Sequence, residues 1–537
     1  MSPLCLSGCS VSKASKRVLF FLTCVRGSRV HCRWKIPRRF GYSSIELRRD
    51  VLFEWFNRDV FNMAFLRWRR WWPWNWSSRT WLFAIVLGLL ASPFVSRWIC
   101  LWQVPDIAVP FDIESVIRAE VPPEEDAFAK YVDVVKSLRQ FEPGKSTTDF
   151  DFNVSHLEGL GDARFNQWLI DRRDILAEYQ AAGAMPQAGG PSLKTADYNV
   201  PLSPHQDFRG LVRFAIAEAS LYEREGNLDQ AWACYLAGVR SGVHVEQPGF
   251  ALCCLIGSTT RSLSYEGVSN WASHSVLKPE QLRTARRDIA TALTRRVRMS
   301  DMGRVEYIVM RNSARDPELA NQMIPHPAVS GPILGFKRFL LWCVGEPELS
   351  LRLERQCLVN RGTEPEKPKH IRRKQRASTR LVFELDPQAP RQRGQLDAIS
   401  LVRAIESTFP FYGNRQFYSA DLHLDLALQR GDARATMIMV LLAAQEYQRI
   451  HGEFPELLAE LVPDFLNEIP FDPMDVTGAP IRYRREAHGE AIVWSIGQNE
   501  VDDDGNIDSP TFDDIGYHIR VKPLTEATTD HPSRAQK

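Results

Sequence analysis

DFRGLVRFAIAEASLYEREGNLDQAWACYLAGVRSG, residues 207–242, carries the clearest helical pattern in the chain. Apolar residues recur at intervals of three and four on both sides of Gly226-Asn227. This spacing puts apolar side chains on one face of a helix, and a Gly-Asn pair is typical of a turn. The apolar positions are Leu211, Phe214, Ala215, Leu221 and Tyr222, then Ala231, Trp232, Tyr235, Leu236 and Val239. The segment therefore predicts a helical hairpin in a mainly α protein.

The same hairpin resembles one unit of a tetratricopeptide repeat. The matching small, aromatic, turn-glycine, alanine and aromatic positions are Ala219, Tyr222, Gly226, Ala231 and Tyr235. Gly238 replaces the family's late alanine, and the closing proline is absent. The resemblance implies repeat-like stacking of hairpins with a peptide-binding groove. An ordinary amphipathic hairpin is the alternative, because one unit of about 34 residues matches and a solenoid needs about three.

Outward from the hairpin, we expect a mainly α fold of helical hairpins that could be repeat-like. An N-terminal transmembrane helix and a small C-terminal α+β module complete it. The expected boundaries are 1–79 for a basic cytoplasmic segment, 80–98 for the transmembrane helix, 99–123 for a juxtamembrane linker, 124–358 for the helical domain, 359–397 for a basic Pro-containing linker, 398–431 for connecting helices, 432–525 for the α+β module and 526–537 for a disordered tail. The linker contains KPKHIRRKQR, residues 367–376, which is typical of a solvated, mobile segment.

The C-terminal module begins with a helix that Asp432 is expected to cap and Gly452 to end. The stretch IPFDP, residues 469–473, follows as a proline-locked extended segment. Three strands are predicted at residues 481–484, 491–495 and 517–521. The first two form a hairpin.

This order of features resembles the C-terminal part of the type II secretion major pseudopilins. The shared features are the long helix, Gly452-x-Phe454-Pro455, Leu457 to Leu461, Ile469 to Pro473, Tyr483, and Trp494-Ser495-Ile496-Gly497 leading into an acidic loop. The resemblance covers about 85 residues. The prepilin processing site is missing from the apolar N-terminal segment, so assembly into a pilus-like filament is not implied.

The acidic loop EVDDDGNID, residues 500–508, is the one candidate metal site in the sequence. Its oxygen ligands would be Glu500, Asp502, Asp504, Asn506 and Asp508. Ca²⁺ takes six to eight oxygens, and this alternation wraps them around one point. A comparable loop in the pseudopilins binds calcium, so the resemblance also implies calcium here.

The closing ligand of this loop is not specified by the sequence. Thr511 stands where an EF-hand loop has its bidentate Glu, and Asp513 or Asp514 could replace it. A solvated acidic turn after a strand is the alternative to a calcium site.

The uncharged run TWLFAIVLGLLASPFV, residues 80–95, predicts the transmembrane helix. Tryptophans flank it on both sides, as in the interfacial belts of membrane proteins. Arginines precede the run and acids follow it, which places the N-terminus in the cytoplasm. We therefore expect a single-pass protein of the bacterial inner membrane with an extracytoplasmic bulk. A cleaved signal peptide is the alternative.

Residues 1–62 are basic, carry four cysteines and differ in character from the rest of the chain. Met63 begins a conventional export start, with a basic region before an apolar one. We therefore expect translation to start at Met63. Mass spectrometry that detects peptides from residues 1–62 would contradict this.

Catalytic motifs are missing from the sequence. HExxH, GxSxG, a P-loop and GxGxxG do not occur, and the SxxK at residues 275–278 lacks its companion signatures. The net charge of +2 gives no reason to expect a polyanionic partner, and an extracytoplasmic placement argues against nucleic acids and nucleotides. The ten cysteines form no CxxC pair, and we expect those beyond the anchor to be buried apolar residues, with disulfides as the alternative.

These features predict a membrane-anchored, non-enzymatic envelope protein with an interaction or structural role. Its expected partners are the membrane, through the single anchor, and an envelope protein. Ca²⁺ is the only cofactor that these features suggest. One alternative is an envelope hydrolase whose site forms only in the fold. The other is an accessory component of a secretion or pilus-like system.

Overall fold

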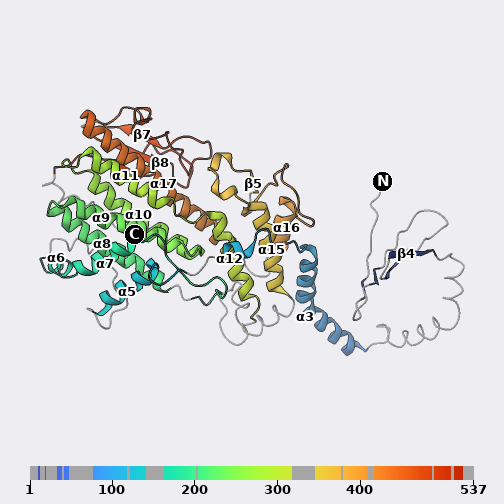
Figure 1. Cartoon of the computed structure of the whole chain (residues 1–537). Coiled ribbons are helices and arrows are strands. Elements are labelled where there is room, and N and C mark those ends of the chain that lie inside the picture. Colours follow the sequence, from blue (N-terminus) through green and yellow to red (C-terminus); the bar gives the residue numbers. More distant parts are fainter. Residues whose placement is uncertain are drawn as a thin grey trace, which may run out of the picture. The chain divides into compact units, whose positions relative to one another are not determined.

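The computed structural model describes most of the chain from residue 77 onward and a few strands before it (Figure 1). The described residues are 10–11, 18–19, 33–38, 41–46, 77–117, 121–140, 163–200, 203–316, 345–376, 379–408, 415–486, 489–508 and 513–523. The chain divides into two compact units, Met1–Pro93 and Phe94–Lys537. The expected start at Met63 lies outside the described residues.

The first unit contains an antiparallel sheet in the order β1-β2-β3-β4. Its strands are β1 (Ser10–Val11), β2 (Val18–Leu19), β3 (Arg33–Arg38) and β4 (Gly41–Glu46). β3 and β4 pair in continuous register from Arg33↔Glu46 to Arg38↔Gly41.

Helix α3 (Ser78–Gln103) occupies the segment where the sequence predicts a transmembrane helix. The prediction of a spanning helix is wrong: within the described part of the chain, no helix is both long and apolar enough to cross a membrane. Arg79 and Arg97 both fall inside α3, and the uncharged stretch between them is shorter than the ~20 residues that a span requires. The fold class is therefore corrected to a mainly helical protein with small sheets. The expected localisation and membrane partner are not tested and stay predictions.

The second unit is built mainly from helices. They are α4 (Ile113–Val116), α5 (Ala127–Gln140), α6 (Ala163–Ile170), α7 (Arg173–Ala184), α8 (Ser203–Arg224), α9 (Leu228–Glu246), α10 (Ala251–Ala272), α11 (Pro279–Leu293), α12 (Met299–Ser313), α15 (Glu346–Arg361), α16 (Ala398–Thr408) and α17 (Arg415–His451). The shorter elements are η5 (Glu364–Glu366), η6 (Lys369–Ile371), β5 (Gln375–Arg376), β6 (Thr379–Phe383), η7 (Leu458–Leu461), β7 (Arg482–Arg485), β8 (Ala491–Ser495) and β9 (Ile515–Ile519).

The predicted helical hairpin is confirmed as α8 and α9. Gly226 takes a φ of +77° in the turn, a conformation that glycine adopts without strain. The side chain of Asn227 then caps α9 by accepting the N–H of Gln230 at 3.4 Å. The wider resemblance to repeat proteins is not tested and stays a prediction.

Helices α9 and α10 approach each other so closely that glycines are required between them. A Cβ on Gly257 would lie 2.3 Å from the carbonyl oxygen of Gly242, and one on Gly267 would lie 2.0 Å from Cε1 of Tyr235. Gly238, which stands at the alanine position of the repeat family, would clash with a serine hydroxyl of α10 at 2.3 Å. The departure from the repeat pattern thus has a packing reason.

Helix α17 runs straight through Asp432, where the sequence predicts a helix start. Just before Asp432, Gly431 lies against α10, where a Cβ would be 2.1 Å from a serine hydroxyl. Further along α17, the buried carboxylate of Glu446 accepts hydrogen bonds from Arg283 Nε at 2.7 Å and Arg286 at 3.0 Å, both on α11. These contacts hold α17 between α10 and α11.

The three predicted C-terminal strands are confirmed as the antiparallel sheet β7-β8-β9. Tyr483 pairs with Val493, which in turn pairs with Tyr517. This sheet shares one hydrophobic core with the helices, with buried members from Ala127 in α5 to Ile519 in β9. No break in the core occurs at residue 432, where we expected a separate module to begin.

The basic run 367–376, expected as a mobile linker, packs against its neighbours. Lys369 Nζ donates to the carbonyl of Met474 at 2.9 Å. Arg373 donates to the carbonyls of Glu384 at 2.6 Å and Asn360 at 3.0 Å. Main-chain oxygens at the end of α15, after β6 and near residue 474 therefore order a segment whose charge alone indicated solvation.

The described cysteines agree with the buried, apolar reading. Cys234, Cys253, Cys254 and Cys357 are buried, and Cys343 lies outside the described residues. Burial raises the pKa of Cys234 and of Cys253 to about 12, so both stay protonated at neutral pH.

Candidate functional site

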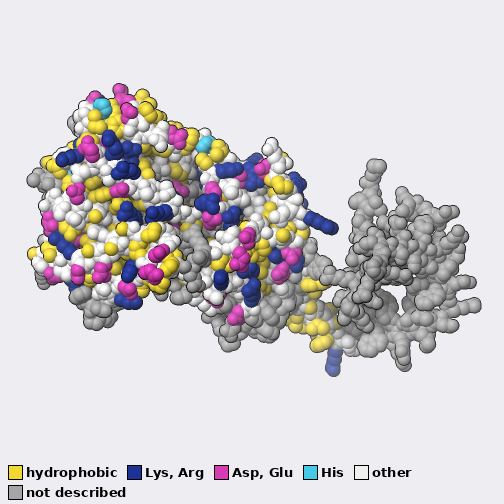
Figure 2. All heavy atoms as spheres, in the orientation of Figure 1, with side chains coloured by type: hydrophobic (Ala, Val, Ile, Leu, Met, Phe, Trp, Pro, Cys, Tyr) yellow, Lys and Arg dark blue, Asp and Glu magenta, His cyan; other side chains and the backbone are white. Residues whose placement is uncertain are grey.

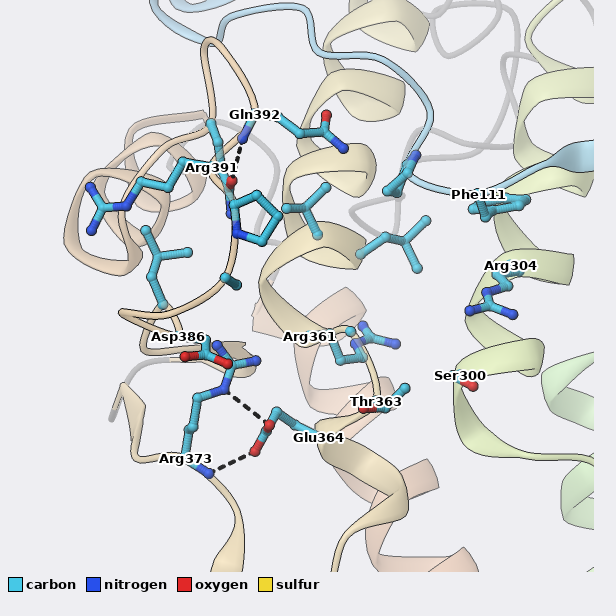
Figure 3. A pocket seen from close by; sticks show the side chains of 18 of the residues that line it. Phe111, Ser300, Arg304, Arg361, Thr363, Glu364, Arg373, Asp386, Arg391 and Gln392 are labelled. Carbon is cyan, nitrogen blue, oxygen red and sulfur yellow. Dashed lines mark hydrogen bonds and ion pairs between the residues drawn. The ribbon is translucent and has the colours of Figure 1, made fainter.

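A cavity of about 360 Å³ lies between α12, the end of α15 and the segment that follows β6 (Figure 3). Its walls come from parts of the chain that are far apart in sequence. The lining residues are Pro110, Phe111, Ser300, Arg304, Leu358, Val359, Arg361, Gly362, Thr363, Glu364, Lys367, Arg373, Leu385, Asp386, Ala389, Pro390, Arg391, Gln392 and Gln395. The volume is within the range of small-molecule sites.

Positive charge dominates this lining. The basic lining residues are Arg304, Arg361, Lys367, Arg373 and Arg391, and the acidic ones are Glu364 and Asp386. On the visible face of the second unit as a whole, side chains of both signs are interspersed (Figure 2). The excess of positive charge is thus a local property of the cavity.

Glu364, at the floor of the cavity, is already neutralised. Its carboxylate accepts hydrogen bonds from Lys367 Nζ at 2.6 Å and from the Arg373 main chain at 2.7 Å, and Arg373 Nε lies 3.0 Å away. Burial by itself raises the pKa of Glu364, but these hydrogen bonds outweigh it and hold the pKa below its usual value. The carboxylate therefore stays ionised and does not compensate any further cation.

Arg361, the last residue of α15, is the one basic residue of the described lining that is buried. It is only 8% exposed, and its Nε is buried without a hydrogen-bond partner among the residues that the structure describes. Its guanidinium lies against α12 at Gly303, where a Cβ would be 3.2 Å from the terminal nitrogen. In Figure 3 the side chain points into the cavity.

Arg304 reaches the cavity from α12, on the side opposite Arg361 (Figure 3). Its guanidinium donates to Asp301 at 3.0 Å, and that carboxylate also accepts from Arg298 at 3.0 Å. One acid is therefore shared between two arginines. Phe111 lies beside Arg304, with 5.9 Å between the guanidinium carbon and the ring centroid.

Two hydroxyl groups, Ser300 and Thr363, lie below the two arginines in Figure 3. The Ser300 hydroxyl is hydrogen-bonded to the carboxylate of Glu366. The described lining contains no His or Cys, the side chains that most often act as a base or nucleophile near neutral pH. Because Ser300 donates to Glu366, the lining donors suited to holding an anion are the guanidinium groups and the Thr363 hydroxyl.

The predicted calcium ligands are spread over separate partners. Four of the five carboxylate and amide side chains are occupied by other groups: Glu500 pairs with Lys369, Asp504 with Arg484, and Asp508 with His518. Asp502 accepts from both Arg482 and Trp494. Asn506 donates its main-chain N–H to the carbonyl of Asp503. Within the described ranges, no three His, Cys, Asp or Glu side chains lie together as a metal site. The structure thus does not bring the five predicted ligands to one point.

Asp514 is the acid that does turn into this loop. Its Oδ2 accepts the N–H groups of Asp503 and Gly505, each at 3.0 Å, while its Oδ1 is buried and has no hydrogen-bond partner among described residues. Burial raises the pKa of Asp514 to about 6, and the nearby Asp502 and Asp503 add to the rise. Sequence reasoning named Asp514 only as an alternative ligand. Calcium binding stays a prediction.

Histidines that look isolated in sequence gain buried partners. His274 Nε2 lies 3.1 Å from Glu223, which also accepts the hydroxyl of Tyr235 at 2.7 Å. His244 Nδ1 lies 2.9 Å from the hydroxyl of Tyr131. Both groups are enclosed in the helical core and face no described cavity.

The cavity residues themselves were not found from the sequence. Phe111 was assigned to a juxtamembrane linker, and Lys367, Arg373 and Arg391 to a mobile one. Arg361 was assigned to the same linker, and no local signal distinguishes it from a surface arginine.

No family model matches the chain, and no curated protein or solved structure matches it. The resemblances to pseudopilins and to tetratricopeptide repeats therefore gain no support from relatives and stay predictions. The functional argument rests on the geometry of the cavity.

Proposed function

We propose that this protein binds a small anionic molecule in the cavity between α12 and α15. One observation carries the proposal: Arg361 is buried, faces the cavity, forms no ion pair with a described residue, and has an Nε without a described hydrogen-bond partner. Glu364 does not supply a counter-charge, since it is held by Lys367 and Arg373. Asp386, the other acid of the lining, accepts the main-chain N–H of Gln388.

The energetics support a ligand as the missing partner. An unpaired buried charge is destabilising by several kcal/mol, roughly, and natural proteins rarely keep one without compensation. A bound anion would supply charge-assisted hydrogen bonds to Arg361, each contributing about 1.5–3 kcal/mol. Displacement of water from an enclosed cavity would strengthen them further.

Binding of sulfate, phosphate and acetate by the full chain tests this proposal by calorimetry and by thermal shift. Arg361→Met keeps the length of the side chain and removes its charge. We expect it to weaken binding of the tightest anion at least tenfold, roughly, from the loss of charged hydrogen bonds. Arg485→Met is the matched control, because Arg485, on β7, forms an exposed ion pair with Glu453. Equal affinities in the two variants would overturn the proposal.

The envelope interaction role expected from the sequence stays a prediction. A ligand-binding cavity is compatible with an interaction protein of the envelope. The hydrolase and secretion-accessory alternatives also stay predictions. A pull-down from solubilised membranes that recovers no reproducible partner would count against the interaction role.

Calcium is a second candidate ligand, favoured by the buried and unpartnered Oδ1 of Asp514. We expect millimolar Ca²⁺ to raise the Tm of the full chain, because an ion bound only to the folded state stabilises it. Asp514→Asn should abolish the shift, whereas Glu453→Gln, on an exposed pair outside the loop, should not. A wild-type Tm that Ca²⁺ does not change removes the site from consideration.

A further inference from the structure

We infer that the group held between Arg361 and Arg304 is a phosphomonoester dianion on a soluble organic molecule. This inference rests on the proposed anion-binding function. It adds three things: the charge of the ligand group, the arginine that binds its second negative charge, and the size and polarity of the organic part of the ligand.

The charge of the site is the first argument. Arg361 has no described counter-charge, and Arg304 shares the single carboxylate of Asp301 with Arg298. A monoanion such as a carboxylate or sulfonate would neutralise Arg361 and leave Arg304 under-compensated. A dianion satisfies both arginines, and a phosphomonoester carries about two charges near neutral pH, since its second pKa is about 6.

The donors around the cavity are the second argument. Two guanidinium groups approach from opposite sides, and the hydroxyl of Thr363 lies below them (Figure 3). The Ser300 hydroxyl is not a free donor, because it donates to Glu366. A phosphomonoester has three terminal acceptor oxygens, one more than a carboxylate. Arginine is the side chain best matched to such a group, because its planar donors pair with two oxygens at once.

The size and the apolar wall are the third argument. About 360 Å³ is far more than a single phosphate group occupies. Phe111, Leu358 and Pro390 contribute apolar surface to the same cavity. The ring of Phe111 is fixed edge-on against Tyr307, with centroids 5.8 Å apart and planes at 85°. This wall suits a compact organic group attached to the phosphate.

Three probes of graded chemistry test the inference on the full chain by calorimetry. They are phenyl phosphate, benzenesulfonate of the same shape but a single charge, and inorganic phosphate without the organic group. At pH 7.5 we expect phenyl phosphate to bind roughly tenfold or more tighter than either of the others, because an added charged hydrogen bond contributes that much. Equal binding of phenyl phosphate and benzenesulfonate overturns the dianion, while the proposed anion-binding function stands.

The pH dependence separates the charge of the ligand from its shape. At pH 5.5 most phenyl phosphate is a monoanion, so its advantage over benzenesulfonate should shrink to about threefold or less. The lining offers no described His to titrate in this range, and Glu364 keeps its charge because its pKa is lowered. An advantage that persists unchanged at pH 5.5 contradicts the inference.

Two variants assign the roles of the arginines. Arg304→Met should weaken phenyl phosphate at least tenfold, roughly, but change benzenesulfonate by no more than about twofold. Arg361→Met should weaken both. If Arg304→Met weakens phenyl phosphate and benzenesulfonate equally, Arg304 does not bind the second negative charge of the phosphate, and the inference fails. If none of the three probes binds the wild type, the proposed function fails with it.

A lipid headgroup is the other source of a phosphomonoester. Sedimentation with phosphatidylcholine vesicles, with and without phosphatidic acid, distinguishes the two sources. For a soluble ligand we expect equal pelleting with both vesicle types. Additional pelleting with phosphatidic acid that Arg361→Met removes would overturn the soluble source.

Discussion

Arg482 binds three aspartates at once and so fixes the C-terminal sheet. It donates to Asp472 at 2.7 Å, to Asp475 at 2.5 Å and to Asp502 at 3.2 Å. The side chain of Asp472 is fully buried and also accepts the hydroxyl of Ser495 at 2.7 Å. Buried charges are stable only when paired and hydrogen-bonded, so the Arg482 guanidinium holds the IPFDP turn against β7, and the Asp472–Ser495 hydrogen bond joins it to β8.

Asp472→Ala should lower the free energy of unfolding by about 3 kcal/mol or more. The change leaves buried donors unsatisfied and breaks a buried ion pair. Urea denaturation measures the loss. Glu453→Gln, which breaks the exposed pair with Arg485, is the control and should change stability by less than ~1 kcal/mol. A similar small effect of both variants would show that Asp472 is not the buried anchor described above.

His244 makes stability depend on pH. Burial lowers the pKa of His244 to about 4, and Arg295 adds to the effect. In the unfolded chain the pKa is ~6.5, so between pH 6.5 and 4 the unfolded state binds more protons and stability falls as the pH falls. We expect a loss of about 2 kcal/mol between pH 7 and pH 5 from this residue, within a maximum of roughly 3 kcal/mol. Urea unfolding at the two pH values measures it.

The control for this residue is a second histidine. His244→Gln should lose less stability than the wild type between pH 7 and pH 5, whereas the exposed His451→Gln should follow the wild type. If His244→Gln loses as much stability between pH 7 and pH 5 as the wild type, other titratable groups cause the loss.

At the residue scale, sequence patterns identified IPFDP and the acidic loop but not their partners. Asp502 was predicted to face a metal ion, and it instead binds Arg482 and Trp494. The cavity was missed altogether, because Phe111, Arg304 and Arg361 meet only through the packing of α12 against α15. Pairings between distant residues leave no periodic trace in a single sequence.

The contact between α9 and α10 shows which features of a helix depend on its own sequence and which depend on the neighbouring helix. The helices and the turn at Gly226 were predictable, since periodicity and turn chemistry act over a few residues. The requirement for glycine at positions 238 and 267 was not, because it comes from a neighbouring helix. The continuation of α17 through Asp432 was not predicted either, because an Asp at that position was taken as a helix cap.

Gly267→Ala should destabilise the protein by about 1–3 kcal/mol, because the added methyl group would overlap the ring of Tyr235, which is buried. Gly88→Ala is the control. No atom lies within 4 Å of the added Cβ in α3, so we expect no loss and a gain of up to ~1 kcal/mol from helix propensity. Thermal and urea unfolding measure both. A loss in Gly88→Ala as large as in Gly267→Ala would contradict the packing explanation.

At the scale of the whole molecule, one core joins segments that the sequence suggested were separate. Buried residues of α10, α17 and β8 belong to the same cluster. Composition and proline content placed a linker at 359–397, but Arg373 within it donates to the main-chain oxygens of Glu384 and Asn360. Fold class could be predicted as mainly helical, whereas the spanning helix was wrong and the domain boundaries did not mark breaks in the core.

The shared core predicts that α10 and β8 unfold together. In hydrogen exchange, peptides from residues 251–272 and 491–495 should show the same opening free energy, because both elements belong to one cooperative unit. Asp472→Ala should lower both values equally although it changes only the C-terminal sheet. A loss confined to β7-β9 would indicate two independently folding parts.

The unpaired Arg361 has a consequence for anyone who optimises this sequence. A screen that rewards heat resistance alone would select an apolar residue at position 361, because a well-packed apolar side chain is often at least as stable as a buried charge. Directed evolution for robustness would therefore erase the cavity's main recognition group first. A stabilised variant should be checked for phenyl phosphate binding before it replaces the natural chain in any study of function.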